Sequence, residues 1–137
     1  MGIGIDIIEV PRIEKQLGSG AESFIRRVFS DSEVSYCESK LKNKAQNYAV
    51  RFAAKEAFFK AIGTGWRKGL SWRDVAMTND ELGKPSIVVS GQAQKIIDAL
   101  HVSKIHVSVS HLNQMAVAII ILEQESLCHT SDLTKNV

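Results

Sequence analysis

The sequence has few cysteines and no long apolar run, and both absences limit what the protein can be. Its only two cysteines, Cys37 and Cys128, lie far apart without metal-ligand spacing, so we expect reduced thiols in a cytosolic protein rather than a disulfide framework. The longest apolar run, from Ala116 to Leu122, is too short to span a bilayer. Residues 1–6 lack the basic segment of a secretory signal, and Asp6 stands where a myristoylation motif needs Ser or Thr. We therefore expect a cytoplasmic protein without a membrane segment.

Prolines are also scarce, and the net charge is small. The 137 residues include two prolines, and 45% of them are hydrophobic and 23% charged, which is typical of one globular domain with a real core. The net charge is only +2, but residues 40–68 contain eight basic side chains and one acid, Glu56, a local excess of seven. Such a segment would attract an anionic partner, unless it is simply a solvated helix face. No nucleic-acid motif accompanies it, so nucleic acid is the weaker candidate.

The hydrophobic pattern predicts an α+β fold. Ile3, Ile5 and Ile7 alternate with other residues as in a strand, and Pro11 suits the first turn of a helix over 11–17. The other predicted elements are a helical segment at 24–29, a helix from 31 to about 40, a long helix at 43–62, strands at 72–78 and 86–89, a helix at 91–100, and a hairpin of strands 104–110 and 116–123. We expect residues 1–123 to form a single domain, a mostly antiparallel sheet packed on the long helix. The polar residues 124–137 would form a tail.

Two charged residues stand among apolar ones on the long predicted helix. Glu56 and Lys60 are four residues apart and therefore share a face, and at about 100° per residue that face includes the apolar Phe52. Arg51 and Lys55 fall on a polar stripe well round the helix. Charges on an apolar face are costly unless they are paired or bind a ligand or metal. The pair is therefore the first place to look for function.

Asp6 is the second unexpected charge, because aspartate is depleted in strand interiors. It shares a strand face with Gly4, which leaves space beside it. A lone carboxylate in a strand is often an edge or capping residue. Together with Glu56 and Lys60, however, it suggests a magnesium and phosphate site, because magnesium takes one or two protein carboxylates along with water and substrate phosphate. Spacing alone does not show that Asp6 and Glu56 meet in space.

Further candidates lie in loops and on the last hairpin. The segment Gly63-Thr64-Gly65 is either a helix stop or a place where a ligand approaches the backbone, and Lys84, in a predicted turn, could reach a phosphate. His106 lines one face of a predicted strand together with two serines, and His111 follows at the strand end. A Ser-His hydrolase is disfavoured, since no nucleophile elbow and no orienting acid is evident. Hydrogen bonding to a ligand or to a neighbouring subunit is favoured.

Three segments together resemble one family. They are residues 4–13 around Asp6, residues 51–65 around Glu56 and Lys60, and residues 106–111, with Gly83-Lys84-Pro85 between them. This combination resembles the holo-acyl-carrier-protein synthases, the short bacterial type of 4′-phosphopantetheinyl transferase, over about residues 2–123. Leu112 departs from the pattern, because the family often has Thr there, so a hydroxyl contact at that point is in doubt.

The resemblance implies a magnesium-dependent enzyme with the 4′-phosphopantetheinyl transferase fold. It would transfer 4′-phosphopantetheine from coenzyme A to a serine of apo acyl carrier protein and release adenosine 3′,5′-bisphosphate. Asp6 and Glu56 match the magnesium-binding, catalytic acids, and Lys60 matches the lysine that handles phosphate and proton. The coenzyme A contacts would come from Arg51, Lys60, Gly63, Thr64, Lys84, Pro85 and His106. Arg12 would contact the acidic carrier protein, and the family forms homotrimers with active sites between subunits.

Two other functions compete with this hypothesis. A coenzyme A or nucleotide-binding module without transfer activity would keep the lysines and the glycine loop but would not need both acids. A small RNA-binding α+β domain would bind RNA in a salt-dependent way, indifferent to Asp6. For the transferase, positioning and charge neutralisation would supply most of the catalysis. The proton of the carrier serine could pass to a metal-bound water, to Glu56 or to neutral Lys60.

Overall fold

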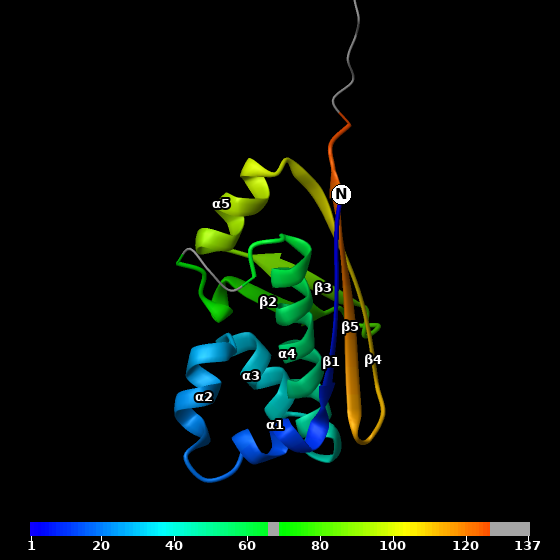
Figure 1. Ribbon diagram of the computed structural model, residues 1–137. Helices are drawn as coiled ribbons and strands as arrows, with labels where there is room; N and C mark the ends of the chain where they lie inside the picture. The colour runs from blue at the N-terminus through cyan, green and yellow to red at the C-terminus, as the bar shows by residue number, and fades with distance from the viewer. Residues whose placement is uncertain (66–68, 127–137) are drawn as a thin grey trace, which may run out of the picture.

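The fold is organised around one long helix, α4 (Lys44–Ala61). The structure is a computed structural model that describes residues 1–65 and 69–126. In it, α4 packs against β1 and β5 of one sheet and also contacts α1, α3 and β2 (Figure 1). The other helices are α1 (Val10–Gln16), α2 (Ala21–Val28), α3 (Asp31–Glu38) and α5 (Gly91–Ala99), with 3₁₀ turns η1 (Leu41–Asn43) and η2 (Trp72–Asp74). The strands are β1 (Gly2–Glu9), β2 (Val75–Asn79), β3 (Pro85–Val89), β4 (Val102–His111) and β5 (Met115–Gln124).

The strands form two antiparallel sheets. The larger has the order β1-β5-β4, so β1 and β4 are its edges, and the smaller pairs β2 with β3. The predicted α+β class with antiparallel pairing is confirmed, although the strands are divided between two sheets. Asp6 lies opposite Ala118, and Ala118 is buried, so Asp6 is on the sheet face that packs on α4. Within the described ranges, the longest helices are too short or too polar to cross a membrane.

Strand β1 lies unusually close to α4 because two of its residues lack a side chain. A Cβ at Gly4 would collide with the carbonyl oxygen of Ala57, and one at Gly2 with the carbonyl oxygen of Ala61. The backbones can therefore approach more closely than larger residues would allow. This close contact brings Asp6, two residues after Gly4, next to the side chains of α4.

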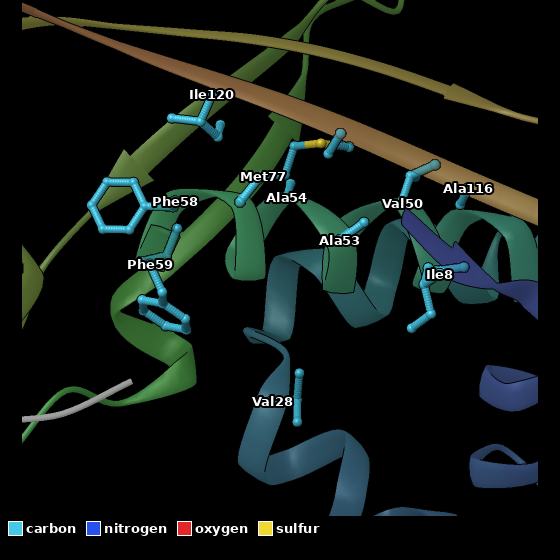
Figure 2. Close-up of a cluster of buried hydrophobic side chains, with 14 of the residues drawn as sticks. Ile8, Val28, Val50, Ala53, Ala54, Phe58, Phe59, Met77, Ala116 and Ile120 are labelled. Atoms are coloured by element: carbon cyan, nitrogen blue, oxygen red, sulfur yellow. The ribbon is translucent and has the colours of Figure 1, made fainter. Parts of the chain in front are cut away.

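The hydrophobic core surrounds α4 on several sides. Ala53, Ala54 and Phe58 of this helix are fully buried, and they pack with Ile8 of β1 and Ile120 of β5 (Figure 2). A helix enclosed in this way has almost no solvated stripe. The periodicity of the sequence therefore could not show which face of α4 is exposed to solvent.

Two sequence predictions are wrong in detail. The predicted polar stripe of the long helix is not at the surface, since Arg51 and Lys55 are 1% and 0% exposed. The basic segment thus presents fewer charges to solvent than its sequence suggests. The predicted strand 72–78 begins only at Val75, because Ser71 and Asp74 form a capping box around η2. The predicted tail lies outside the described residues from 127 onward.

Candidate active site

Lys60 and Asp6, which are distant in the sequence, form an ion pair between α4 and β1. The Nζ atom of Lys60 donates a hydrogen bond to Asp6 Oδ1 at 3.0 Å and another to the carbonyl oxygen of Ile5 at 2.9 Å. The Lys60 side chain is 54% exposed and that of Asp6 is 16% exposed. Asp6 is therefore anchored in the structure, whereas Lys60 has room to move toward a ligand.

Glu56 completes this cluster from the preceding turn of α4. Burial raises the pKa of the Glu56 carboxyl, and the negative charge of Asp6 raises it further, while Lys60 and Arg12 act in the opposite direction. These influences place both carboxylates and Lys60 within electrostatic reach of one another. The structure thus brings Asp6 close to the Glu56 and Lys60 pair, a proximity that sequence spacing alone could not show.

The donor set of the cluster fits magnesium better than a structural metal. Among the described residues, no three His, Cys, Asp or Glu side chains converge, so a protein cage of the zinc type is absent there. Two carboxylates on separate elements match the sparse protein ligation of magnesium. A dication between them would relieve the repulsion that contributes to the raised pKa of Glu56.

A cavity of about 420 Å³ opens beside the cluster, between β1, the first two helices and α4. Ile8 lies two residues after Asp6 on the same strand, and Phe52 lies one turn before Glu56 on the same helix. The wall is mostly apolar with basic residues, and it is formed by Ile8, Arg12, Ile13, Gln16, Phe24, Arg27, Val28, Phe52 and Trp72. The cavity suits an apolar segment of a partner that carries acidic groups.

A second cavity, of about 380 Å³, lies where Arg51 is buried. The Arg51 guanidinium donates to Asn79 Oδ1 at 2.6 Å and to the carbonyl oxygen of Asn47 at 3.3 Å. It lies 4.2 Å from the ring centroid of Tyr36. Arg51 Nε is buried and has no hydrogen-bond partner within the described part of the chain. A buried cation with an unused donor is suited to an anion.

Of the predicted coenzyme A contacts, Arg51 lines this second cavity, and Lys84 and Pro85 directly follow Gly83, which also lines it. Gly83 and His111 line the cavity with Arg51, and the Lys84 amide is fixed by Asp80 Oδ1 at 2.8 Å. Pro85 begins β3 opposite Asn79.

The remaining three candidates lie apart from the Arg51 cavity. Gly63, at φ 78°, ends α4, and Thr64 bonds the carbonyl oxygen of Gly65. His106 lies on β4 and shares a 2.8 Å hydrogen bond with Glu123, an interaction that lowers the pKa of Glu123.

His111 and Asn79, which line the second cavity, were not among the predicted coenzyme A contacts. The sequence places His111 at a strand end within the matched segment 106–111, and Asn79 directly after the predicted strand 72–78. Their shared position on the cavity wall with Arg51 depends on the β2–β3 turn and the β4–β5 turn both lying near α4. The available signal was the placement of both residues at strand ends, where binding groups often lie.

Comparison with known proteins identifies the family of this chain. The family model of the 4′-phosphopantetheinyl transferase superfamily matches residues 2–120. The chain belongs to this superfamily. It is 45% identical over 123 residues to a holo-[acyl-carrier-protein] synthase of Geobacter sp. strain M21, covering 90% of this chain and 98% of the relative.

Solved structures of the same family have the same fold. A holo-(acyl-carrier-protein) synthase of Bacillus anthracis in complex with CoA (3′,5′-ADP) superimposes with a TM-score of 0.74 at 38% identity, covering 90% of this chain and 96% of that one. The Helicobacter pylori synthase in complex with coenzyme A gives a TM-score of 0.77 at 32% identity, covering 88% and 99%. The predicted fold class is thus confirmed at the level of the family.

Proposed function

We propose that the protein is a holo-acyl-carrier-protein synthase, which transfers 4′-phosphopantetheine from coenzyme A to a serine of apo acyl carrier protein. The observation that supports this most strongly is the convergence of Asp6, Glu56 and Lys60 beside the 420 Å³ cavity. These are the positions that match the acids and lysine of the family motif. The other product is adenosine 3′,5′-bisphosphate.

In this proposal Asp6 and Glu56 hold magnesium. A bound magnesium ion would neutralise charge on the pyrophosphate of coenzyme A. The chain itself supplies the fixed carboxylate of Asp6 and a Glu56 carboxylate that is partly shielded from water. Lys60, one turn away, exchanges its bond to Asp6 for a phosphate oxygen and so places a positive charge where the leaving group develops negative charge.

The two cavities are proposed to receive the two substrates. Arg12 and the apolar wall around Phe52 would contact the acidic carrier protein. Arg51 and Gly83 line the second cavity and, together with the adjacent turn residues Lys84 and Pro85, would hold phosphate groups of coenzyme A. Gly63 and Thr64 are the candidate contacts nearest in sequence to Lys60, and His106 is a candidate contributed by the outer face of the large sheet.

These two half-sites lie on different sides of α4, which favours assembly from several subunits. Arg51 and Lys60 are nine residues apart, so at about 100° per residue they point in directions about 180° apart. One coenzyme A molecule spans both half-sites more easily if a neighbouring copy supplies the Arg51 cavity. We therefore propose a homotrimer with active sites between subunits, acting in the cytoplasm.

The outer face of the large sheet offers a surface for that assembly. Ile3, Ile5 and Ile7 project away from α4 and are 66%, 53% and 60% exposed, which is unusual for a row of large apolar side chains. A second copy would cover them. Sedimentation of the wild type should show a trimer. The double variant Ile3→Lys/Ile7→Lys should sediment as a monomer and be less active. A fully active wild-type monomer would exclude the assembly.

Turnover with coenzyme A and apo carrier protein tests the function. With magnesium present, the wild type should release one adenosine 3′,5′-bisphosphate for each carrier serine modified. Coenzyme A binding without release would instead identify a non-catalytic coenzyme A-binding module. RNA binding that falls steeply with salt and is unaffected in Asp6→Ala would favour the RNA-binding alternative.

A further inference from the structure

A buried ion pair joins α4 to α3 and to the chain just before β2. Lys55 Nζ lies 2.8 Å from Glu33 Oε2, and both side chains are 0% exposed. Lys55 also donates to the carbonyl oxygens of Trp72, at 3.1 Å, and of Val75. The pair thus connects three segments of the chain that meet only in the folded state.

The carboxylate of this pair is equally well satisfied. Glu33 Oε2 accepts from the backbone N–H of Ser30, and Glu33 Oε1 accepts from that of Met77, each at 2.9 Å. Glu33 therefore caps α3 and bonds β2 at the same time. Glu33 and Lys55 together thus link α3, α4 and the chain at β2, and both charged groups also have backbone hydrogen-bond partners.

Such a pair is an inefficient source of stability. Burial lowers the pKa of Lys55, which means that the enclosed site disfavours its charged form, and the charge of Glu33 opposes that shift. Well-packed apolar residues often replace buried ion pairs without loss of stability. The role of this pair is therefore to be sought in the groups that it holds in place rather than in its contribution to stability.

One of the two carbonyl groups that Lys55 holds is that of Trp72, and Trp72 forms part of the proposed carrier-protein cavity. The Trp72 ring stacks on Phe52, with centroids 5.1 Å apart and planes at 21°, and it meets Phe59 edge-on at 5.2 Å. Phe52 is one turn before Glu56 on α4. The position of Trp72 therefore fixes one wall of the cavity relative to the acid site.

We propose that Lys55 and Glu33 are positioning residues for carrier-protein docking. Their pair holds Trp72 against Phe52 and so keeps the carrier-protein cavity in a fixed position beside Asp6 and Glu56. Neither side chain touches a substrate. This proposal rests on the proposed transferase function and adds that docking, rather than chemistry or coenzyme A binding, depends on the buried pair.

The test is steady-state kinetics of Lys55→Met/Glu33→Gln, which removes both charges with little change of volume. The assay is run below the melting temperature of the variant, as determined by circular dichroism. We expect the KM for apo carrier protein to rise about tenfold, as for the loss of one well-placed interaction. The KM for coenzyme A and the kcat at saturating carrier protein should stay within about twofold of wild type.

The exposed pair Lys44–Glu38 provides the matched control. It also joins a lysine of α4 to a glutamate of α3, at 3.2 Å, but its side chains are 40% and 45% exposed. Lys44→Met/Glu38→Gln should leave the KM for carrier protein unchanged. If the buried double variant does not fold, Lys55→Arg keeps a positive charge opposite Glu33 but changes the geometry of the bond to the Trp72 carbonyl oxygen, and it should raise that KM about threefold.

Three results would overturn the proposal. An unchanged KM for carrier protein in the folded variants would show that Trp72 needs no such support. A parallel change in kcat and both KM values would show a purely structural role. A selective change in the KM for coenzyme A would assign the pair to the other half-site. If wild type itself transfers nothing, the proposed function fails as well, and this wild-type measurement distinguishes the two failures.

Discussion

The two sides of α4 carry charged residues in opposite circumstances. Toward β1, Lys60 is 54% exposed and bonded to Asp6, and the pKa of the neighbouring Glu56 is raised. Toward α3 and β2, Lys55 and Glu33 have no exposure and several well-placed partners. Lys55, Glu56 and Lys60, which contribute to the two sets, lie within six residues of one helix.

This difference in exposure and hydrogen bonding distinguishes charged residues that support the fold from charged residues that are candidates for ligand binding. Charges that are fully buried and fully bonded have little capacity left for a ligand, whereas the β1-facing cluster is open and contains two carboxylates that repel each other. Arg51 combines both features, because it is buried and bonded to Asn79 but keeps one donor, Nε, without a partner in the described chain. Completeness of hydrogen bonding thus identifies binding groups better than charge or helix position does.

Replacing Asp6 or Glu56, the two acids on the β1 side of α4, should have the largest effect on transfer. Asp6→Ala or Glu56→Ala should lower transfer at least about a thousandfold, because magnesium loses half of its protein ligands. Melting temperature should change little, since both groups lie at the open side of α4. Glu9→Ala, at the exposed end of β1, is the control. Near-normal release of adenosine 3′,5′-bisphosphate by either acid variant would falsify the two-acid site.

Replacing Lys60 should give the next largest effect. Lys60→Met removes the charge proposed to meet the pyrophosphate, so kcat should fall about a hundredfold. Magnesium affinity should be kept or slightly increased, because Lys60 no longer occupies Asp6 Oδ1. Initial rates over a magnesium titration measure both quantities. An unchanged kcat would remove Lys60 from the mechanism.

The two histidines of β4 allow a sharper test of the coenzyme A site. His111 lines the Arg51 cavity, whereas His106 is bonded to Glu123. His111→Ala should raise the KM for coenzyme A about tenfold, and His106→Ala should raise it less unless a neighbouring subunit brings His106 into the site. The reverse order would favour the assignment made from the sequence motif.

The smallest effect concerns pH. Burial raises the pKa of Glu56, and magnesium binds the deprotonated carboxylate. Affinity should therefore be complete well above the raised pKa and fall as the pH decreases toward and through it. Calorimetric titration of magnesium in the presence of adenosine 3′,5′-bisphosphate measures this fall. Glu56→Gln should abolish it, and an identical pH dependence in that variant would assign the fall to another group.

The sequence predicts those parts of the structure that depend on local signals. Ser30 and Glu33 form a capping box where the helix from residue 31 is predicted to begin, and Gly63 ends α4, one of the two roles predicted for the segment 63–65. The alternation in β1 correctly indicates a strand. Asp6 and Glu56 stand out because each is an acid in an apolar element.

Partnerships across the fold could not be predicted in this way. The burial of Lys55 depends on Glu33, on a different helix, and on carbonyl groups of Trp72 and Val75. The role of His111 depends on two turns that meet only in the folded chain. Helical periodicity treats every polar residue as solvent-facing, so it placed Arg51 and Lys55 incorrectly.

The most direct test is a crystal structure of the protein with magnesium and coenzyme A. We predict a metal ion bound by Asp6 and Glu56, with Lys60 Nζ moved from Asp6 to an oxygen of the pyrophosphate. The Arg51 cavity that holds the other phosphate should come from a neighbouring subunit. A pyrophosphate bound away from these acids, with Lys60 still on Asp6, would contradict the account.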